Sequence, residues 1–190
     1  MAGQGRRTFR RRGRAQARSR RPFPRSRWRW GRDIAFLILL VYATIRLIMA
    51  LQEMQGPARA MDGDSLKLEG REIRLFGIDA PELHQTCTRA DGGKWPCGRR
   101  AKERLAALLR QGEVACRSIE QDRWGRDVAV CKVKGEDIAA TLVREGLAVA
   151  FGAESPYRRE EAAARNARRG LWQGPFERPE TWRQKHRRQD

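Results

Sequence analysis

The chain has 190 residues and a formal net charge of +18, a length that leaves room for one modest domain with additions rather than for several domains. Residues 1–32 contain thirteen arginines and no acidic residue; subtracting these charges from +18 leaves about +5 for everything that follows. The overall charge therefore excludes no class of partner for the folded part, and a basic tail can contact nucleic acid or anionic lipid equally well.

Residues 1–32 are predicted to be disordered, because high charge with few aliphatic residues cannot form a core. Residues 34–51 are nearly all apolar, IAFLILLVYATIRLIMAL, and near the lower length limit for a membrane-spanning helix. Arg46 lies toward the C-terminal end, where its side chain can reach the interface. We therefore expect a transmembrane signal anchor at 33–51 in a bacterial inner (cytoplasmic) membrane. The arginine-rich flank predicts a cytoplasmic N-terminus and a periplasmic, extracytoplasmic remainder.

Two alternatives to this anchor exist. A buried core helix is one, although the segment has no polar face. A cleaved signal peptide is the other, since Ala58-Arg59-Ala60 resembles a cleavage site. Cleavage there would remove residues needed for a first strand, so an uncleaved anchor is favoured, and cleavage stays open.

All four cysteines follow the apolar segment. They allow three pairings. We expect Cys87–Cys97 and Cys116–Cys131, because each pair closes a short loop; in an oxidising compartment each disulfide stabilises by roughly 2–3 kcal/mol. A zinc site is the rival interpretation, but the spacing contains no CxxC and the chain has only two histidines.

The segment 52–57 is predicted to be a short polar linker, followed by a globular part. Alternation of apolar and polar residues predicts two strands around 65–68 and 72–75, joined by a tight turn at Glu69-Gly70. Further strands are expected at 113–119, 126–134 and 147–151, and helices at 99–112, 136–146 and 155–170, the last with Ser155 as N-cap. Residues 171–190 are expected to be irregular. This order favours a small antiparallel barrel with helices packed on it.

Acidic residues gather where two of these strands meet. Asp64 opens one strand of the expected hairpin, and the segment RLFGIDAPE places Asp79 and Glu82 after the other. Three carboxylates can therefore converge. Hard oxygen ligands suit Ca²⁺ or Mg²⁺, with water and a substrate oxygen completing the coordination.

Two arginines lie near these acids. Arg74 is on the same hairpin, and Arg126 ends the turn DRWGR. A guanidinium suits phosphate and stabilises charge that develops on a phosphoryl group. A hard metal, a spare carboxylate and two arginines together indicate phosphodiester hydrolysis. Each motif alone also has a structural interpretation: a turn for DGD, and a solvent-facing or ion-paired side chain for a strand arginine.

The motifs DGDS, RLFGIDAPE, DRWGR, LVREGLA and the closing GLW resemble the thermonuclease, or staphylococcal-nuclease-like, family over roughly residues 58–174. This resemblance implies an α+β fold, a five-stranded oligonucleotide-binding-type (OB-fold) barrel with three helices. It also implies a calcium-dependent nuclease that cleaves DNA and RNA and leaves 3′-phosphates. The expected order is a tail (1–32), an anchor (33–51), a linker (52–57), this domain (58–174) and a basic C-terminal extension (175–190).

The resemblance also implies roles for individual residues. Asp64 and Asp79 correspond to the calcium carboxylates, and the carbonyl of Ala80 to a backbone ligand. Glu82 corresponds to the general base or water-orienting residue.

Arg74 and Arg126 correspond to two phosphate clamps. Trp124 and Phe151 stand where aromatic residues stack on a base, which both can do. The expected substrate is therefore nucleic acid, DNA or RNA, and no obligatory protein partner is implied.

Arg144 and Glu161 correspond to residues that support the fold. The loop between Cys87 and Cys97 follows Glu82 directly, so we expect this disulfide to brace the active-site loop. The rival functions are a non-catalytic nucleic-acid-binding or polyanion-binding module of the same fold, and an accessory protein of envelope or polysaccharide assembly.

Overall fold

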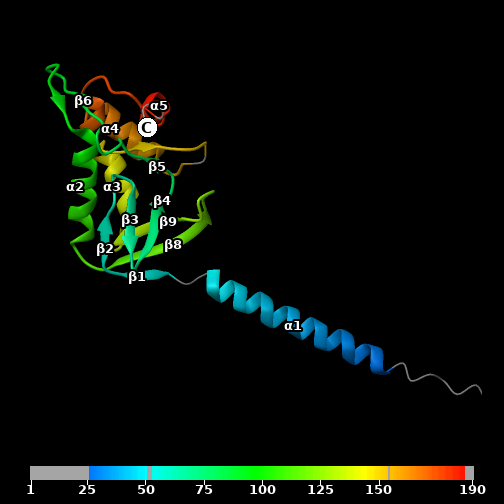
Figure 1. Cartoon of the computed structure of the whole chain (residues 1–190). Coiled ribbons are helices and arrows are strands. Elements are labelled where there is room, and N and C mark those ends of the chain that lie inside the picture. Colours follow the sequence, from blue (N-terminus) through cyan, green and yellow to red (C-terminus); the bar gives the residue numbers. More distant parts are fainter. Residues whose placement is uncertain (1–25, 51–52, 154, 187–190) are drawn as a thin grey trace, which may run out of the picture. The chain divides into compact units, whose positions relative to one another are not determined.

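The computed structural model describes residues 26–50, 53–153 and 155–186 (Figure 1). The chain separates into two compact units, residues 1–45 and 46–190. A long helix, α1, runs over Ser26–Ala50. All described strands belong to the second unit.

Helix α1 contains the predicted anchor segment 33–51 except for residue 51, which lies outside the described residues. Its apolar side chains between Ile34 and Leu47 are exposed. Within the described part of the chain, no helix has the length and apolarity required to cross a membrane. The tail prediction needs one correction: residues 26–32 are helical, because extending an existing helix costs far less than starting one. Residues 1–25 of that tail are not among the described residues.

Beyond α1, the described residues of the second unit form short strands, four helices and one 3₁₀ turn. In chain order they are β1 (Met54–Gly56), β2 (Ala58–Ala60), β3 (Ser65–Leu68), β4 (Arg71–Leu75), β5 (Ile78–Asp79), β6 (Cys87–Thr88), β7 (Lys94–Trp95), α2 (Cys97–Leu109), β8 (Val114–Gln121), β9 (Asp127–Val133), β10 (Glu136–Asp137), α3 (Ile138–Arg144), β11 (Val149–Ala150), α4 (Arg158–Asn166), η1 (Gly170–Gln173) and α5 (Pro179–His186).

Most strands form one seven-stranded sheet in the order β1-β8-β9-β4-β3-β2, with β10 paired to β9. The remaining described strands form two separate pairs, β11–β5 and β6–β7. The expected five-stranded, antiparallel barrel is therefore corrected in two respects. The sheet has seven strands: four of the five predicted strands form β3, β4, β8 and β9, and they are joined by β1 from the predicted linker, β2 and β10, whereas the predicted strand at 147–151 pairs with β5 outside this sheet. In addition, β4 and β9 are parallel, which is possible because α2 and β8 provide the long connection that parallel strands require.

The predicted hairpin at the centre of the sheet is confirmed as β3–β4. Glu69 and Gly70 both have positive φ, 47° and 88°, as a two-residue primed turn requires. The register places Ser65 opposite Arg74. Asp64 therefore enters the sheet beside the strand that carries Arg74.

The three predicted helices are confirmed as α2, α3 and α4. Ser155 is not the N-cap of α4, which begins later, at Arg158. The Ser155 hydroxyl instead donates to the carbonyl of Gly77 at 2.7 Å, so it fixes the chain after β4. Residues 171–190 are not irregular throughout, because α5 forms with proline at its first position, Glu180 in its first turn and basic residues in its last turn.

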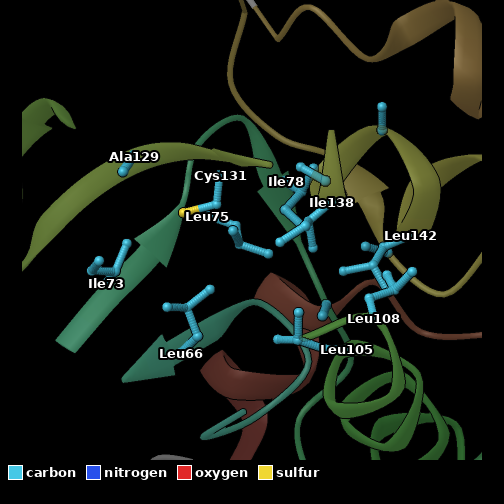
Figure 2. Close-up of a cluster of buried hydrophobic side chains, with 14 of the residues drawn as sticks. Leu66, Ile73, Leu75, Ile78, Leu105, Leu108, Ala129, Cys131, Ile138 and Leu142 are labelled. Carbon is cyan, nitrogen blue, oxygen red and sulfur yellow. The ribbon is translucent and has the colours of Figure 1, made fainter. Parts of the chain in front are cut away.

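The core lies between the sheet and helices α2 and α3. Figure 2 shows side chains of the sheet meeting those of the two helices: Leu66, Ile73, Leu75, Leu105, Leu108, Ile138 and Leu142. The two predicted disulfides are confirmed. Cys87–Cys97 joins β6 to the start of α2, and Cys116–Cys131 joins opposite positions of β8 and β9. β3, β4 and α2 are thus packed on one core. This packing fixes the positions of Asp64, which precedes β3, and of Asp79 and Glu82, which follow β4.

Candidate active site

Asp64 is positioned by the turn that precedes β3. The carboxylate of Asp62 accepts hydrogen bonds from the backbone N–H groups of Asp64 (3.0 Å) and Ser65 (2.7 Å). Gly63 packs so closely that a Cβ added to it would lie 2.7 Å from the Cβ of Ala80. The sequence DGDS is therefore a local turn whose acidic first residue caps the strand and whose glycine permits contact with the Asp79–Ala80 segment.

Asp79 lies on β5, which is held by antiparallel pairing with β11, where Val149 is opposite Asp79. The carboxylate of Asp64 reaches the same segment, because its Oδ2 accepts from the N–H of Ala80 at 3.2 Å. Asp64 is 5% exposed and Asp79 is 1% exposed. Two buried carboxylates, one from the turn before β3 and one from β5, therefore converge.

Arg74 lies between these two carboxylates. Its Nη2 is 2.9 Å from Asp64 Oδ2 and 3.2 Å from Asp79 Oδ1. Burial raises the pKa of Asp64 from its ordinary 3.8 to about 8, although the positive charge of Arg74 acts in the opposite direction. The acids and the arginine predicted from the hairpin are thus in direct contact.

A second guanidinium, that of Arg183 on α5, reaches the other side of Asp79. Its Nη1 is 2.9 Å from Asp79 Oδ1 and 2.8 Å from Glu82 Oε1, and its Nη2 is 3.1 Å from Asp79 Oδ2. Burial acts to lower the pKa of Arg183, but hydrogen bonds to Asp79 and Glu82 outweigh it and raise the pKa above its ordinary value. Arg183 was not predicted, because no local pattern links α5 to residues a hundred positions earlier.

Arg126 is oriented by the turn between β8 and β9. The carboxylate of Asp122 accepts from the backbone N–H groups of Trp124 (2.9 Å) and Arg126 (3.0 Å) and from Arg126 Nε (2.8 Å). Arg126 Nη1 also donates to Glu72 at 3.2 Å. The hydrogen bonds from Arg126 lower the pKa of Asp122, outweighing the effect of desolvation. Glu72 and Asp122 are site residues that sequence reasoning did not assign.

Two aromatic side chains stand at the edge of this region. Trp124 is 64% exposed and Phe151 is 42% exposed. The guanidinium carbons of Arg123 and Arg126 lie 4.0 and 5.2 Å from the ring centroid of Trp124. The exposed faces are available for stacking with a planar group.

One open cavity of about 1230 Å³ connects these groups. Apart from Asp79, which is buried and is not part of the lining, every predicted catalytic, metal-binding and substrate-binding residue lines this cavity: Asp64, Arg74, Ala80, Glu82, Trp124, Arg126 and Phe151. Helix α5 adds Glu180, Arg183 and Gln184 to the lining.

The loop that carries Glu82 is held in place by the side chain of Gln85 and by the first turn of α2. Gln85 is fully buried; its Oε1 accepts from the N–H of Glu82 at 3.2 Å and its Nε2 donates to the carbonyl of Glu177 at 2.7 Å. The first turn of α2 also packs on Glu82, since a Cβ added at Gly98 would lie 1.7 Å from its carbonyl oxygen. Cys97, disulfide-bonded to Cys87, precedes this glycine.

The carboxylate oxygens of Asp64 and Asp79 are suitable ligands for a hard divalent cation, but they do not form a complete ligand set. Asp64 and Asp79 already hold one cation in common, the guanidinium of Arg74. Among the residues that the structure describes, no three Asp, Glu, His or Cys side chains are arranged to hold a metal ion. A metal would therefore be bound by Asp64, Asp79 and further oxygens from the backbone, water or substrate.

Glu161 and Arg144 lie elsewhere in the unit. Glu161 is 9% exposed, and its Oε1 accepts from the N–H of Ala150 on β11 at 3.2 Å. The side chain of Arg144, at the end of α3, is exposed.

Several known proteins are similar to this chain in sequence. The micrococcal nuclease of Shigella flexneri is 30% identical over 172 residues, covering 80% of this chain and 91% of that protein. The succinoglycan biosynthesis protein ExoI of Rhizobium meliloti is 29% identical over 127 residues, covering 65% of this chain and 66% of that protein. The probable endonuclease LCL3 of Paracoccidioides brasiliensis is 33% identical over 120 residues, covering 54% of this chain and 34% of that protein. This chain therefore spans about two thirds of ExoI and about one third of the endonuclease.

The family model described as staphylococcal nuclease homologue matches residues 72–174. The matched range contains Arg74, Asp79, Glu82 and Arg126, whereas Asp64 precedes it and Arg183 follows it. With more than half of its length matched, the chain belongs to the family of staphylococcal nuclease homologues.

Proposed function

We propose that this protein is a calcium-dependent nuclease that hydrolyses phosphodiester bonds of DNA and RNA and leaves 3′-phosphate products. The observation that carries the proposal is the meeting of two buried carboxylates, Glu82 and two arginines at one cavity with exposed aromatic rings at its edge. Acids alone suit many metal sites, but acids with arginines and stacking surfaces suit a charged, base-carrying polymer.

In this proposal Asp64, Asp79 and the carbonyl of Ala80 hold Ca²⁺. The bound cation supplies Lewis-acid activation of a phosphoryl oxygen. Glu82 orients a water molecule and accepts its proton, because its carboxylate reaches the cavity while its backbone is fixed by Gln85. The Asp64 and Asp79 carboxylates also keep Arg74 directed at the cavity.

Arg74 and Arg126 bind the phosphate and stabilise charge as it develops on the phosphoryl oxygens. Ion pairs with Asp122 and Glu72 already fix the side-chain conformation of Arg126, so little conformational entropy is lost when phosphate binds. Trp124 and Phe151 stack on bases, which favours nucleic acid without selecting a sequence.

We further propose that the segment 33–51 anchors the protein in a bacterial cytoplasmic membrane, with residues 58–174 as a nuclease domain on the outer face. The exposed apolar side chains of α1 support this, as do the thirteen arginines before the segment. Two disulfides support an oxidising compartment.

A second candidate function is a non-catalytic module that binds nucleic acid or another polyanion, including one that serves polysaccharide assembly. Asp64, Asp79 and Glu82 each contact an arginine in the structure, which favours a site that carries no metal. The similarity to a succinoglycan biosynthesis protein points to the same alternative.

The test is cleavage of single-stranded DNA and RNA by the oxidised full-length chain in detergent, with Ca²⁺, Mg²⁺ or a chelator. We expect cleavage with Ca²⁺ and none with the chelator. Glu82→Gln and Arg126→Ala should each lower the rate by about 10²–10³-fold, as loss of a general base or of an electrostatic contact does. Arg117→Ala, an exposed arginine on β8, is the control for loss of one positive charge and should cleave normally.

The two candidate functions give different results. A folded protein that binds Ca²⁺ and DNA without cleaving either nucleic acid contradicts the nuclease proposal. Retention of an acidic polysaccharide in preference to DNA would then support the assembly role.

A further inference from the structure

Helix α5 places the guanidinium of Arg183 against Asp79, a carboxylate that binds the metal ion in the proposed nuclease, and against Glu82. The helix lies beyond the residues matched by the family model, which end at 174. Its Arg183 contacts both Asp79 and Glu82. One of the two arginines that contact Asp79 is therefore supplied by a segment outside the matched range.

The contacts at Asp79 leave little room for another cation. A carboxylate offers about four lone-pair positions. Oδ1 accepts from Arg74 Nη2 and Arg183 Nη1, and Oδ2 accepts from Arg183 Nη2. Three of the four positions are therefore taken. Arg183 occupies both oxygens, so a metal that binds Asp79 through both oxygens must displace Arg183.

Arg183 is easier to displace than Arg74. Arg74 lies on β4 in the interior of the sheet, whereas α5 is a helix of eight residues in which Pro179 is the one buried residue. A helix this short has little stability of its own. Elements with few buried apolar contacts open locally at low free-energy cost.

The segment before α5 is better fixed than α5 itself. Gln85 Nε2 donates to the carbonyl of Glu177, Thr88 N–H donates to the carbonyl of Pro175 at 3.3 Å, and Phe176 packs edge-on against Trp172 at 5.1 Å. After release, α5 therefore stays close to the cavity, and its high effective concentration lets Arg183 return.

We infer that Arg183 is an intramolecular competitor of the metal ion: α5 closes the carboxylate site when Arg183 is bound and is released when a divalent cation binds. This inference rests on the metal site of the proposed function. The protein then binds metal with an affinity lowered by the fraction of molecules in which α5 is closed. The closed form also keeps Glu82 ion-paired with Arg183.

The test is calorimetric titration of the oxidised full-length chain with Ca²⁺. Arg183→Ala should bind Ca²⁺ about tenfold or more tightly than the parent protein, as expected if the open form is a minor state. Lys185→Ala is the matched control: it removes the same charge from the same helix but contacts Glu177 rather than the carboxylate site, and its affinity should stay within about twofold of the parent's.

A second measurement follows the helix directly. Saturating Ca²⁺ should increase hydrogen exchange of the α5 amides in the parent protein, while exchange in α2 stays unchanged. Equal Ca²⁺ affinities for the parent and Arg183→Ala, absence of Ca²⁺ binding by both, or unchanged exchange in α5 would each overturn the inference.

The outcomes also separate this inference from the nuclease proposal. Tighter Ca²⁺ binding by Arg183→Ala without DNA cleavage by either protein supports the competition and contradicts the nuclease. Calcium-dependent cleavage with equal affinities supports the nuclease and contradicts the competition.

Discussion

Gln85 and Glu82 are joined by two hydrogen bonds. The side-chain Oε1 of Gln85 accepts from the N–H of Glu82 at 3.2 Å, and the N–H of Gln85 donates to the carbonyl of Glu82 at 2.7 Å. Gln85 is 1% exposed, and its side-chain Nε2 donates to the carbonyl of Glu177 at 2.7 Å. One buried amide thus links the loop that carries the candidate base to the segment that carries α5.

Replacing Gln85 by alanine should lower the free energy of unfolding by about 1–3 kcal/mol, because two backbone groups lose their partners. The Glu82 loop should become less ordered, so Ca²⁺-dependent cleavage should fall further than the loss of folded protein explains. Urea unfolding and single-stranded DNA cleavage are the measurements.

Two controls sharpen that comparison. Gln111→Ala removes the same side chain from an exposed position and should leave both quantities unchanged. Gln85→Glu keeps the acceptor for the N–H of Glu82 but places a buried carboxyl group against the carbonyl of Glu177, so this variant should be less stable than the parent protein. A Gln85→Ala protein as active and as stable as the parent would contradict this role.

Gly98→Ala should disturb the same loop from the other side. The added Cβ would lie 1.7 Å from the carbonyl oxygen of Glu82 and 2.5 Å from its carbon, and backbone atoms must shift to admit it. Such overpacking costs about 1–3 kcal/mol. Gly112→Ala is the matched control, because its Cβ would meet only side-chain atoms of Lys134 and Val133, at ordinary contact distances of 3.7–4.0 Å. We expect lower melting temperature and slower cleavage for Gly98→Ala alone.

The sequence was informative wherever local physics decides the structure. The turn at Glu69-Gly70, both disulfides and the positions of the three helices were predicted, because turn residues, loop closure and apolar periodicity act over short distances. The parallel pairing of β4 with β9 and the strand at 54–56 were missed. Both depend on contacts between distant segments that no window of sequence contains.

In the candidate site too, contacts between residues close in sequence could be predicted, and contacts between distant segments could not. The closeness of Asp64, Arg74 and Asp79 could be predicted from the sequence, because they lie on a hairpin and on the segment that directly follows it. Arg183 could not, since its partners lie on another element a hundred residues away. The helix at 179–186 was itself missed, although its first-position proline and its charge order are typical of a helix, and neither feature says where the helix docks.

The two disulfides should differ in their effect on activity. Removing Cys87–Cys97 or Cys116–Cys131 with paired serine substitutions should cost about 2–4 kcal/mol of stability in each case, since their sequence separations of 10 and 15 are similar. Cys97 adjoins Gly98, which packs on Glu82, whereas the other pair joins β8 to β9. Cleavage should therefore fall in the Cys87–Cys97 variant below the level explained by unfolding. Equal cleavage by both folded variants would show that this disulfide does not brace the Glu82 loop.

The pKa of Asp64 predicts how stability depends on pH in the absence of metal. Burial raises this pKa from 3.8 to about 8, so between these pH values the folded protein holds a proton that the unfolded chain has released. The unfolding free energy should therefore be highest below about pH 4 with respect to this group, and should decline as pH rises toward 8.

Asp64→Asn removes the titrating group. The loss of unfolding free energy between pH 5 and pH 8 should therefore be smaller in this variant by roughly 2–5 kcal/mol, because each unit of pKa shift corresponds to about 1.4 kcal/mol. Urea unfolding at pH 5 and pH 8 in the presence of a chelator measures the difference. Asp91→Asn, in an exposed loop, is the control and should retain the decline. If the parent protein instead gained stability from pH 5 to pH 8 and Asp64→Asn lost that gain, then Arg74, rather than burial, would govern the ionisation of Asp64.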